Sequence, residues 1–124
     1  MIYILLNAGA ILAATLAGLA FAALRFRRQV SVGTAVTAFV ASAWLCAILA
    51  GALILAPPRG GVWTMTLGSA IVIWAGFVAP VVAASYRFRA LPWRTVASDA
   101  GVWLGMMIVQ AVVLRLIGLV APPV

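Results

Sequence analysis

Four long apolar runs dominate the chain, separated by three short stretches that carry most of the charged residues. The runs cover approximately residues 2–24, 34–56, 62–86 and 96–120. The length of each run is close to the about 20 apolar residues that an α-helix needs to cross the hydrocarbon of a bilayer. The intervening stretches are short enough to make neighbouring helices antiparallel. The pattern therefore predicts an all-α integral membrane protein, a four-helix up-down bundle, with residues 1–124 forming a single transmembrane domain.

Composition supports a membrane protein and limits its chemistry. Hydrophobic residues make up 68% of the chain and charged residues only 7%, which is more apolar surface than a soluble fold of this size could bury. The chain has no histidine, one cysteine and one acidic residue, Asp99. Common proton relays, metal-ligand clusters and histidine-ligated haem sites are therefore missing. We expect no cofactor, no metal and no enzymatic activity.

The basic residues indicate an orientation in the membrane. All 8 of them are arginines, and they lie in short clusters between the apolar runs, which is typical of topology signals and not of nucleic-acid binding. The middle connection holds only Arg59, whereas the first and third hold Arg25, Arg27, Arg28, Arg87, Arg89 and Arg94. Because cytoplasmic loops carry the excess of arginine, we expect a multi-pass protein of the bacterial inner membrane with both termini outside the cytoplasm.

The cytoplasmic boundary has further candidate residues. Trp93 is expected at headgroup depth, and the neighbouring arginines are expected to contact anionic lipid, at roughly 1 kcal/mol per basic residue. Asp99 is predicted in the first turn of the fourth helix, where it complements the helix dipole and meets Arg94 or Arg89; Thr95 or Ser98 would then cap the helix. The alternative is that Asp99 is a titrating acid in a conduction or coupling role.

A proline and a few polar residues interrupt the apolar runs. Pro80 removes a backbone donor, so the third helix is predicted to kink there and to leave the Gly76 carbonyl without its partner. Counted along its span, Gly76 lies near the depth of Thr15, Ser42 and Gln110, and these residues are predicted to form a polar centre. Gln110 would bridge the freed carbonyl and a hydroxyl. The alternative is a polar constriction in a permeation path.

Arg115 is a charge inside the last apolar run, at a depth similar to that of Asn7 near the outer end. Snorkelling towards the outer headgroups is the default expectation for such an arginine. Pairing with Asn7, or reaching the terminal carboxylate of Val124, are the alternatives.

Small residues recur at every fourth position in three of the runs. In membranes, this spacing lets helix backbones approach closely, although an alanine-rich chain also produces it without specificity. The three stripes are Ala10, Ala14, Gly18 and Ala22; Ala38, Ser42, Cys46 and Ala50; and Ala97, Gly101 and Gly105.

Two segments of the second half carry a family resemblance. The stretch Trp74-Ala75-Gly76-Phe77-Val78-Ala79-Pro80 is followed by Pro92-Trp93-Arg94 and then by Asp99-Ala100-Gly101. This arrangement resembles the bacterial membrane proteins grouped as domain of unknown function 1761. The resemblance implies a small four-helix membrane architecture and carries no assigned reaction.

The function expected from these observations is interaction within the membrane. The chain is predicted to be a non-enzymatic protein that contacts membrane lipids and associates with itself, or serves as an accessory subunit of a larger membrane complex. The alternative is a small channel or transporter assembled from several copies, because four helices with so few polar residues can hardly enclose a hydrated path alone.

Overall fold

The computed structural model describes residues 2–25, 31–55 and 61–120, and its regular elements are helices. In chain order they are α1 (Ile2–Leu6), α2 (Ala8–Arg25), α3 (Val32–Leu55), α4 (Val62–Ile73), the π-helix η1 (Trp74–Val78), α5 (Ala79–Phe88) and α6 (Trp93–Ile117). Among the described residues, 3 helices are long and apolar enough to cross a membrane, namely Val32–Leu55, Val62–Phe88 and Trp93–Ile117. The structure is therefore consistent with a multi-pass membrane protein.

The first apolar run forms a helix with an irregularity at Asn7. The backbone N–H of Asn7 donates to the Tyr3 carbonyl at 3.0 Å, and that of Ile11 donates to the Asn7 carbonyl at 2.9 Å. The α-helical bonding pattern thus continues from α1 into α2. Only Ala8–Leu24 forms a continuous apolar helix, and it is shorter than the three membrane-spanning candidates. A fourth crossing at this run stays a prediction.

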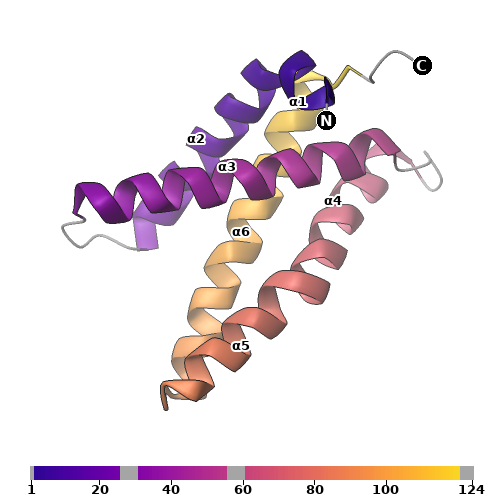
Figure 1. The fold of residues 1–124 in the computed structure, drawn as a ribbon. Coiled ribbons are helices and arrows are strands. Elements are labelled where there is room, and N and C mark those ends of the chain that lie inside the picture. Colours follow the sequence, from indigo (N-terminus) through magenta and orange to yellow (C-terminus); the bar gives the residue numbers. More distant parts are fainter. Residues whose placement is uncertain (1, 26–30, 56–60, 121–124) are drawn as a thin grey trace.

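Helix α6 is the central element of the fold. It packs against α2, α3, α4, η1 and α5, and Figure 1 shows it between α2 and the continuous α4–η1–α5 helix. Its buried side chains cover about half of the helix circumference; they are Val96, Ala100, Val102, Met106, Met107, Gln110, Ala111 and Leu114. Figure 1 also shows α3 lying across α2 and α6, so a simple up-down bundle stays a prediction.

Small residues bring α2 and α6 together. The predicted stripe on α2 is buried along its whole length, with Ala14 fully inaccessible. A Cβ atom built on Gly18 would lie 3.1 Å from Cγ and from Nε2 of Gln110, so the glycine leaves room for that side chain. A Cβ atom on Gly105 would overlap the Phe21 ring. In both places a missing side chain on one helix admits a larger one from the other.

Helix α3 is divided into two halves by its burial. Its second half contains the buried residues of the helix, which are Ser42, Cys46, Ala47, Leu49, Ala50 and Leu53. Its first half is exposed on nearly every side, with exposed fractions of 81% at Val32 and 59% at Val40. Figure 1 shows this half extending beyond the other helices. Only part of α3 therefore belongs to the core of the chain.

Pro80 lies two residues beyond a π-helical segment. The N–H of Ala79 donates to the Trp74 carbonyl, an i to i−5 bond in place of the usual i to i−4 bond. Such wide turns change the register of the carbonyls and accommodate a residue that cannot donate. The sequence predicted a kink at Pro80 with an unpaired Gly76 carbonyl, and both stay predictions. The described structure has a π-helix shortly before the proline, within the apolar helix Val62–Phe88.

The turn between α5 and α6 is shorter than the sequence predicted. Helix α5 continues to Phe88 and α6 begins at Trp93. The N–H of Leu91 donates to the Tyr86 carbonyl at 3.0 Å, and that of Ala90 donates to the Arg87 carbonyl at 3.0 Å. With Ala90 at φ 58°, these two bonds form the left-handed cap that commonly ends a helix. The basic residues here are thus mainly helical.

Candidate functional site

A buried hydrogen bond joins two of the predicted polar residues. Gln110 Nε2 donates to Ser42 Oγ at 2.9 Å, which connects α6 to α3. Both side chains are fully inaccessible, as is Thr15 on α2. Gln110 Oε1 is also buried and has no hydrogen-bond partner among the described residues. The structure thus joins α6 and α3 through a buried polar pair and leaves one acceptor without a partner among the described residues.

Thr15 and Gly76 do not bond to this glutamine. Thr15 Oγ1 donates to the Ile11 carbonyl of its own helix at 2.7 Å, and Cys46 Sγ approaches the same carbonyl at 3.7 Å. Gly76 lies at an exposed position of η1, and no atom outside its own helix segment comes within 4 Å of a Cβ built there. The predicted bridge from Gln110 to the Gly76 carbonyl is therefore wrong, because Gly76 is exposed and Gln110 Nε2 donates to Ser42.

Arg115 has a partner that the sequence did not suggest. Its Nε donates to Thr66 Oγ1 at 2.8 Å, and Thr66 in turn donates to the Val62 carbonyl at 2.8 Å. The described structure therefore shows an interhelical bond between α6 and α4 in place of the predicted snorkelling. Arg115 lies in the last turn of α6, where a cation is also favoured by the helix dipole.

Asn7 also has a different partner from the predicted one. Its Nδ2 donates to the Val120 carbonyl at 2.8 Å, and its Oδ1 accepts from the Val120 N–H at 2.7 Å. Nearby, Tyr3 donates through its hydroxyl to the Ala47 carbonyl at 3.0 Å. These bonds hold the segment after α6 and the second half of α3 to the beginning of the chain. Val124 lies outside the described residues.

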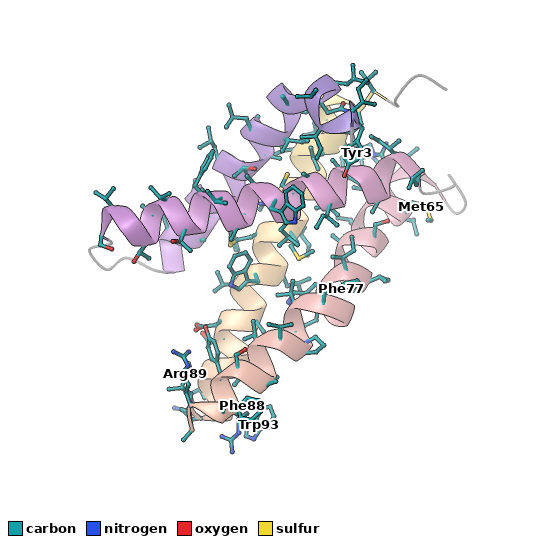
Figure 2. The ribbon with its side chains drawn as sticks, in the orientation of Figure 1. Tyr3, Met65, Phe77, Phe88, Arg89 and Trp93 are labelled. Carbon is teal, nitrogen blue, oxygen red and sulfur yellow. The ribbon has the colours of Figure 1, made fainter. Side chains whose placement is uncertain are left out.

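The basic residues of the second half gather at the turn between α5 and α6. Figure 2 shows Phe88, Arg89 and Trp93 at this end of the molecule, away from Tyr3 and Met65. The Arg87 guanidinium lies 5.1 Å from the centre of the Trp93 ring, and that of Arg89 lies 5.1 Å from the centre of the Tyr86 ring. Cation–π contacts of this kind hold the charged groups close to aromatic surface.

The other predicted basic residues of this boundary are less fully described. Arg94 is exposed on the first turn of α6. Arg25 is the last residue of α2, and nothing is described of its side chain. Arg27, Arg28 and Arg59 lie outside the described residues.

Asp99 lies deeper in its helix than predicted. Because α6 begins at Trp93 and has no acidic residue in its first turn, the predicted dipole effect does not apply. The helix begins after Pro92 without a side-chain cap, so Thr95 and Ser98 are not its caps. Asp99 Oδ2 accepts a hydrogen bond of 2.8 Å from the Tyr86 hydroxyl. The described partner of the carboxylate is thus a tyrosine, in place of Arg94 or Arg89.

A second bond connects the same two helices. Trp74 Nε1 donates to the Ala100 carbonyl at 2.8 Å. The segments that carry the family resemblance therefore meet in space. Together with the Tyr86–Asp99 bond, this contact fixes η1 and α5 against α6.

Sequence reasoning missed Tyr3, Thr66, Trp74 and Tyr86 as polar contacts. For Tyr86 a signal was present, because an antiparallel hairpin with a short turn brings residues at similar distances from the turn together. For Thr66 the sequence held no comparable signal, since its partner Arg115 lies 49 positions away.

No protein-family model matches the chain, and none of the curated proteins or solved structures compared with it gives a significant match. The resemblance to domain of unknown function 1761 stays a prediction.

Proposed function

We propose that this chain is a multi-pass protein of the bacterial inner membrane that works by association, and that its first partner is a second copy of itself. The proposal includes four crossings, with the basic ends on the cytoplasmic side and both termini outside. The observation that supports association is the first half of α3, which no other described part of the chain covers.

Apolar exposure alone does not make a helix associate in lipid, because lipid tails cover it equally well. Close backbone approach through small residues does favour association. Gly33 and Thr37 lie one turn apart on this exposed half. Apart from the chain neighbours and the nearby backbone of its own helix, no atom of the described residues lies within 4 Å of a Cβ built on Gly33. The Thr37 hydroxyl already donates to the Gly33 carbonyl at 2.9 Å, so the surface has no unmet donor there.

Single-cysteine cross-linking in native membranes tests this interface. The native thiol is removed by Cys46→Ala, which is a small change at a buried site. Cysteines are then placed one at a time at Gly33 and Thr37, and for comparison at Val32 and Val36 on another face of the same half-helix. We expect cross-linked dimers from Gly33→Cys and Thr37→Cys, and far fewer from the two valine positions.

A position on α4 supplies the control for random collision. Val72 is 69% exposed and belongs to α4, a different helix from the proposed interface on α3. A Val72→Cys variant should give only background cross-linking. Equal yields at all the positions, or a purified protein that is monomeric by light scattering in several mild detergents, would contradict the proposal.

Topology is tested separately with terminal fusions. Alkaline phosphatase is active only outside the cytoplasm, whereas green fluorescent protein folds best inside it. We expect active phosphatase and no fluorescence for fusions at either end, because the arginines of the α5–α6 turn favour the cytoplasm. Fluorescence at both ends would reverse the orientation, and opposite results at the two ends would show an odd number of crossings.

The buried polar residues do not favour a pore within one copy. Thr15, Ser42 and Gln110 are fully inaccessible, so they are enclosed by packed side chains and line no open path. A channel would have to form between copies, and flux measurements in proteoliposomes with the cross-linked dimer would detect it.

A further inference from the structure

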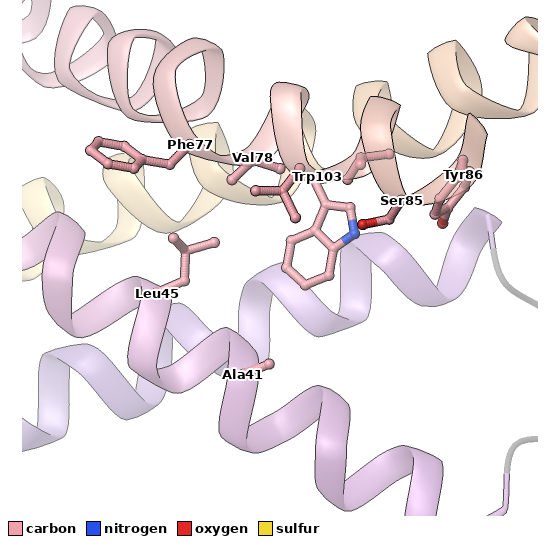
Figure 3. Close-up of a pocket in the computed structure, with 9 residues that line it drawn as sticks. Ala41, Leu45, Phe77, Val78, Ser85, Tyr86 and Trp103 are labelled. Carbon is pink, nitrogen blue, oxygen red and sulfur yellow. The ribbon is translucent and has the colours of Figure 1, made fainter. Parts of the chain in front are cut away.

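A groove separates α3 from the helix formed by η1 and α5. Its volume is about 490 Å³, within the range of about 300–1,000 Å³ typical of small-ligand sites. Leu45 of α3 forms one wall, Phe77 and Val81 form the other, and Trp103 of α6 lies at its base. Figure 3 shows the Trp103 indole projecting into the groove between the two walls.

One wall of the groove changes in polarity along its length. Phe77, Val81 and Ser85 follow each other at intervals of four residues and all line the groove. Arg89 follows four residues later, just after the end of α5. Phe77 and Val81 are 69% and 62% exposed. The wall is thus apolar at one end and carries a hydroxyl about a turn further on. The Arg89 guanidinium lies beyond the lining residues, beside the turn to α6.

Two polar groups in the groove lack a hydrogen-bond partner within the described part of the chain. Among the described residues, neither Trp103 Nε1 nor Ser85 Oγ takes part in a hydrogen bond. Figure 3 shows the indole nitrogen on the side facing Ser85. An unpaired donor in apolar surroundings is unfavourable. This part of the groove therefore favours a ligand that presents acceptor oxygens.

The basic end of the groove has a fixed geometry. Tyr86 lines the groove, and its hydroxyl is held by Asp99 at 2.8 Å. The Arg89 guanidinium lies 5.1 Å from the centre of the Tyr86 ring. Because the ring is held in place, the arginine is kept beside the mouth of the groove, where it can meet an anion.

The geometry points to a binding site for one anionic phospholipid, a role beyond the association of copies proposed above. An acyl chain lies between Leu45 and Val81, and its ester oxygens accept from Trp103 Nε1 and Ser85 Oγ. The phosphate meets Arg89. A helix of a second copy fits less well, because its backbone carbonyls are bonded within the helix and offer no acceptor to the two donors.

Native mass spectrometry tests this site on the full chain in mild detergent. The protein is incubated with equal amounts of phosphatidylglycerol and phosphatidylcholine that carry the same acyl chains. We expect one phosphatidylglycerol to be retained in preference to phosphatidylcholine. Arg89→Gln should lower that preference about fivefold, which corresponds to the ~1 kcal/mol of one basic residue near anionic lipid. Arg94→Gln should not change it, since among the described residues Arg89, but not Arg94, has a ring contact with a residue that lines the groove.

Substitutions at two exposed valines, one inside and one outside the groove, test whether the acyl chain lies there. Val81→Trp fills the groove and should abolish retention of both lipids, whereas Val72→Trp, at an equally exposed position outside this groove, should leave it unchanged. Ser85→Ala is a milder change that cannot disturb folding by its size, and it should weaken retention of both lipids alike.

Three results would overturn the site. They are the absence of a phosphatidylglycerol preference in the unmodified protein, equal effects of Arg89→Gln and Arg94→Gln, and lipid retention that survives Val81→Trp. If Val81→Trp converts dimers to monomers while lipid is still retained, the groove holds a second copy and the lipid site is wrong.

Discussion

The α2–α6 contact and the first half of α3 have similar compositions, but only the first is packed between helices of the described chain. Both are rich in alanine, glycine and threonine at four-residue spacing. On α2 and α6 the gaps left by Gly18 and Gly105 are occupied by Gln110 and Phe21, whereas nothing of the described chain approaches Gly33. A small-residue stripe therefore permits close packing but does not produce it. A larger side chain must also lie opposite the gap.

Filling the gap at Gly18 should have the largest effect on stability. In Gly18→Val the new side chain meets the buried Gln110 amide, which has little room to move. We expect a loss of about 1–3 kcal/mol, the usual cost of overpacking, measured by denaturant unfolding of the monomer in detergent. Gly33→Val is the control on the open half of α3 and should cost nothing measurable. Equal effects at the two glycines would show that helix propensity, and not packing, is responsible.

Removing the two partners of the buried Gln110–Ser42 hydrogen bond one at a time should have unequal effects on stability. Ser42→Ala leaves Gln110 with no partner among the described residues, so it should cost about 1–2 kcal/mol. Gln110→Leu removes the unpaired Oε1 together with the bonded Nε2, so it should be nearly neutral. Both are measured by the same unfolding assay. A Gln110→Leu variant that loses more than Ser42→Ala would mean that Oε1 has a partner in the membrane.

A smaller effect is expected at the edge of the α2–α6 contact. Gly105→Val must displace the Phe21 ring, but this ring is 38% exposed and can turn outwards. We expect a loss of about 1 kcal/mol, visible as a lower Tm in detergent. Phe21→Ala should cancel the effect of Gly105→Val in the double variant, and Gly101→Val, where the neighbouring space is open, should leave Tm unchanged. Additive losses in the double variant would argue against this contact.

The smallest effect is expected on the open half of α3. Val36 is 56% exposed, so Val36→Ala should change the stability of the monomer by less than about 0.5 kcal/mol. Thermal unfolding in detergent measures it. A loss above this range would mean that another part of the chain covers this half-helix, and the contrast between the two regions would then disappear.

The sequence predicted the helical class and the approximate extent of the helices because hydropathy and arginine clusters are local signals. It placed the ends less well. The left-handed turn at Ala90 lets α5 continue to Phe88 and α6 begin at Trp93, and this shift changed the position of Asp99 within its helix. Nothing in the apolar pattern predicts a tight cap formed by alanine, since glycine is the usual residue at that position.

The sequence predicted a polar contact correctly only where a shared depth along the membrane spans was sufficient to identify the two partners. Gln110 and Ser42 share a depth and lie on facing helices, and the structure shows them bonded. Gly76 shares that depth but lies on the outside of η1. Depth along a span is one coordinate, whereas a contact also requires the direction in which the side chain points. The π-helix before Pro80 changes that direction for every residue it contains.

By itself, the sequence determined that this chain is apolar, helical and able to cross a membrane, because hydrophobicity and span length are properties of consecutive residues. The tertiary structure decided which gaps beside small residues are filled by other side chains and which donors remain unpaired in the groove. It also decided that Arg115 donates a hydrogen bond to Thr66. Those outcomes depend on how α3 crosses the other helices and on the turn of η1, and such relations arise only when distant segments pack together.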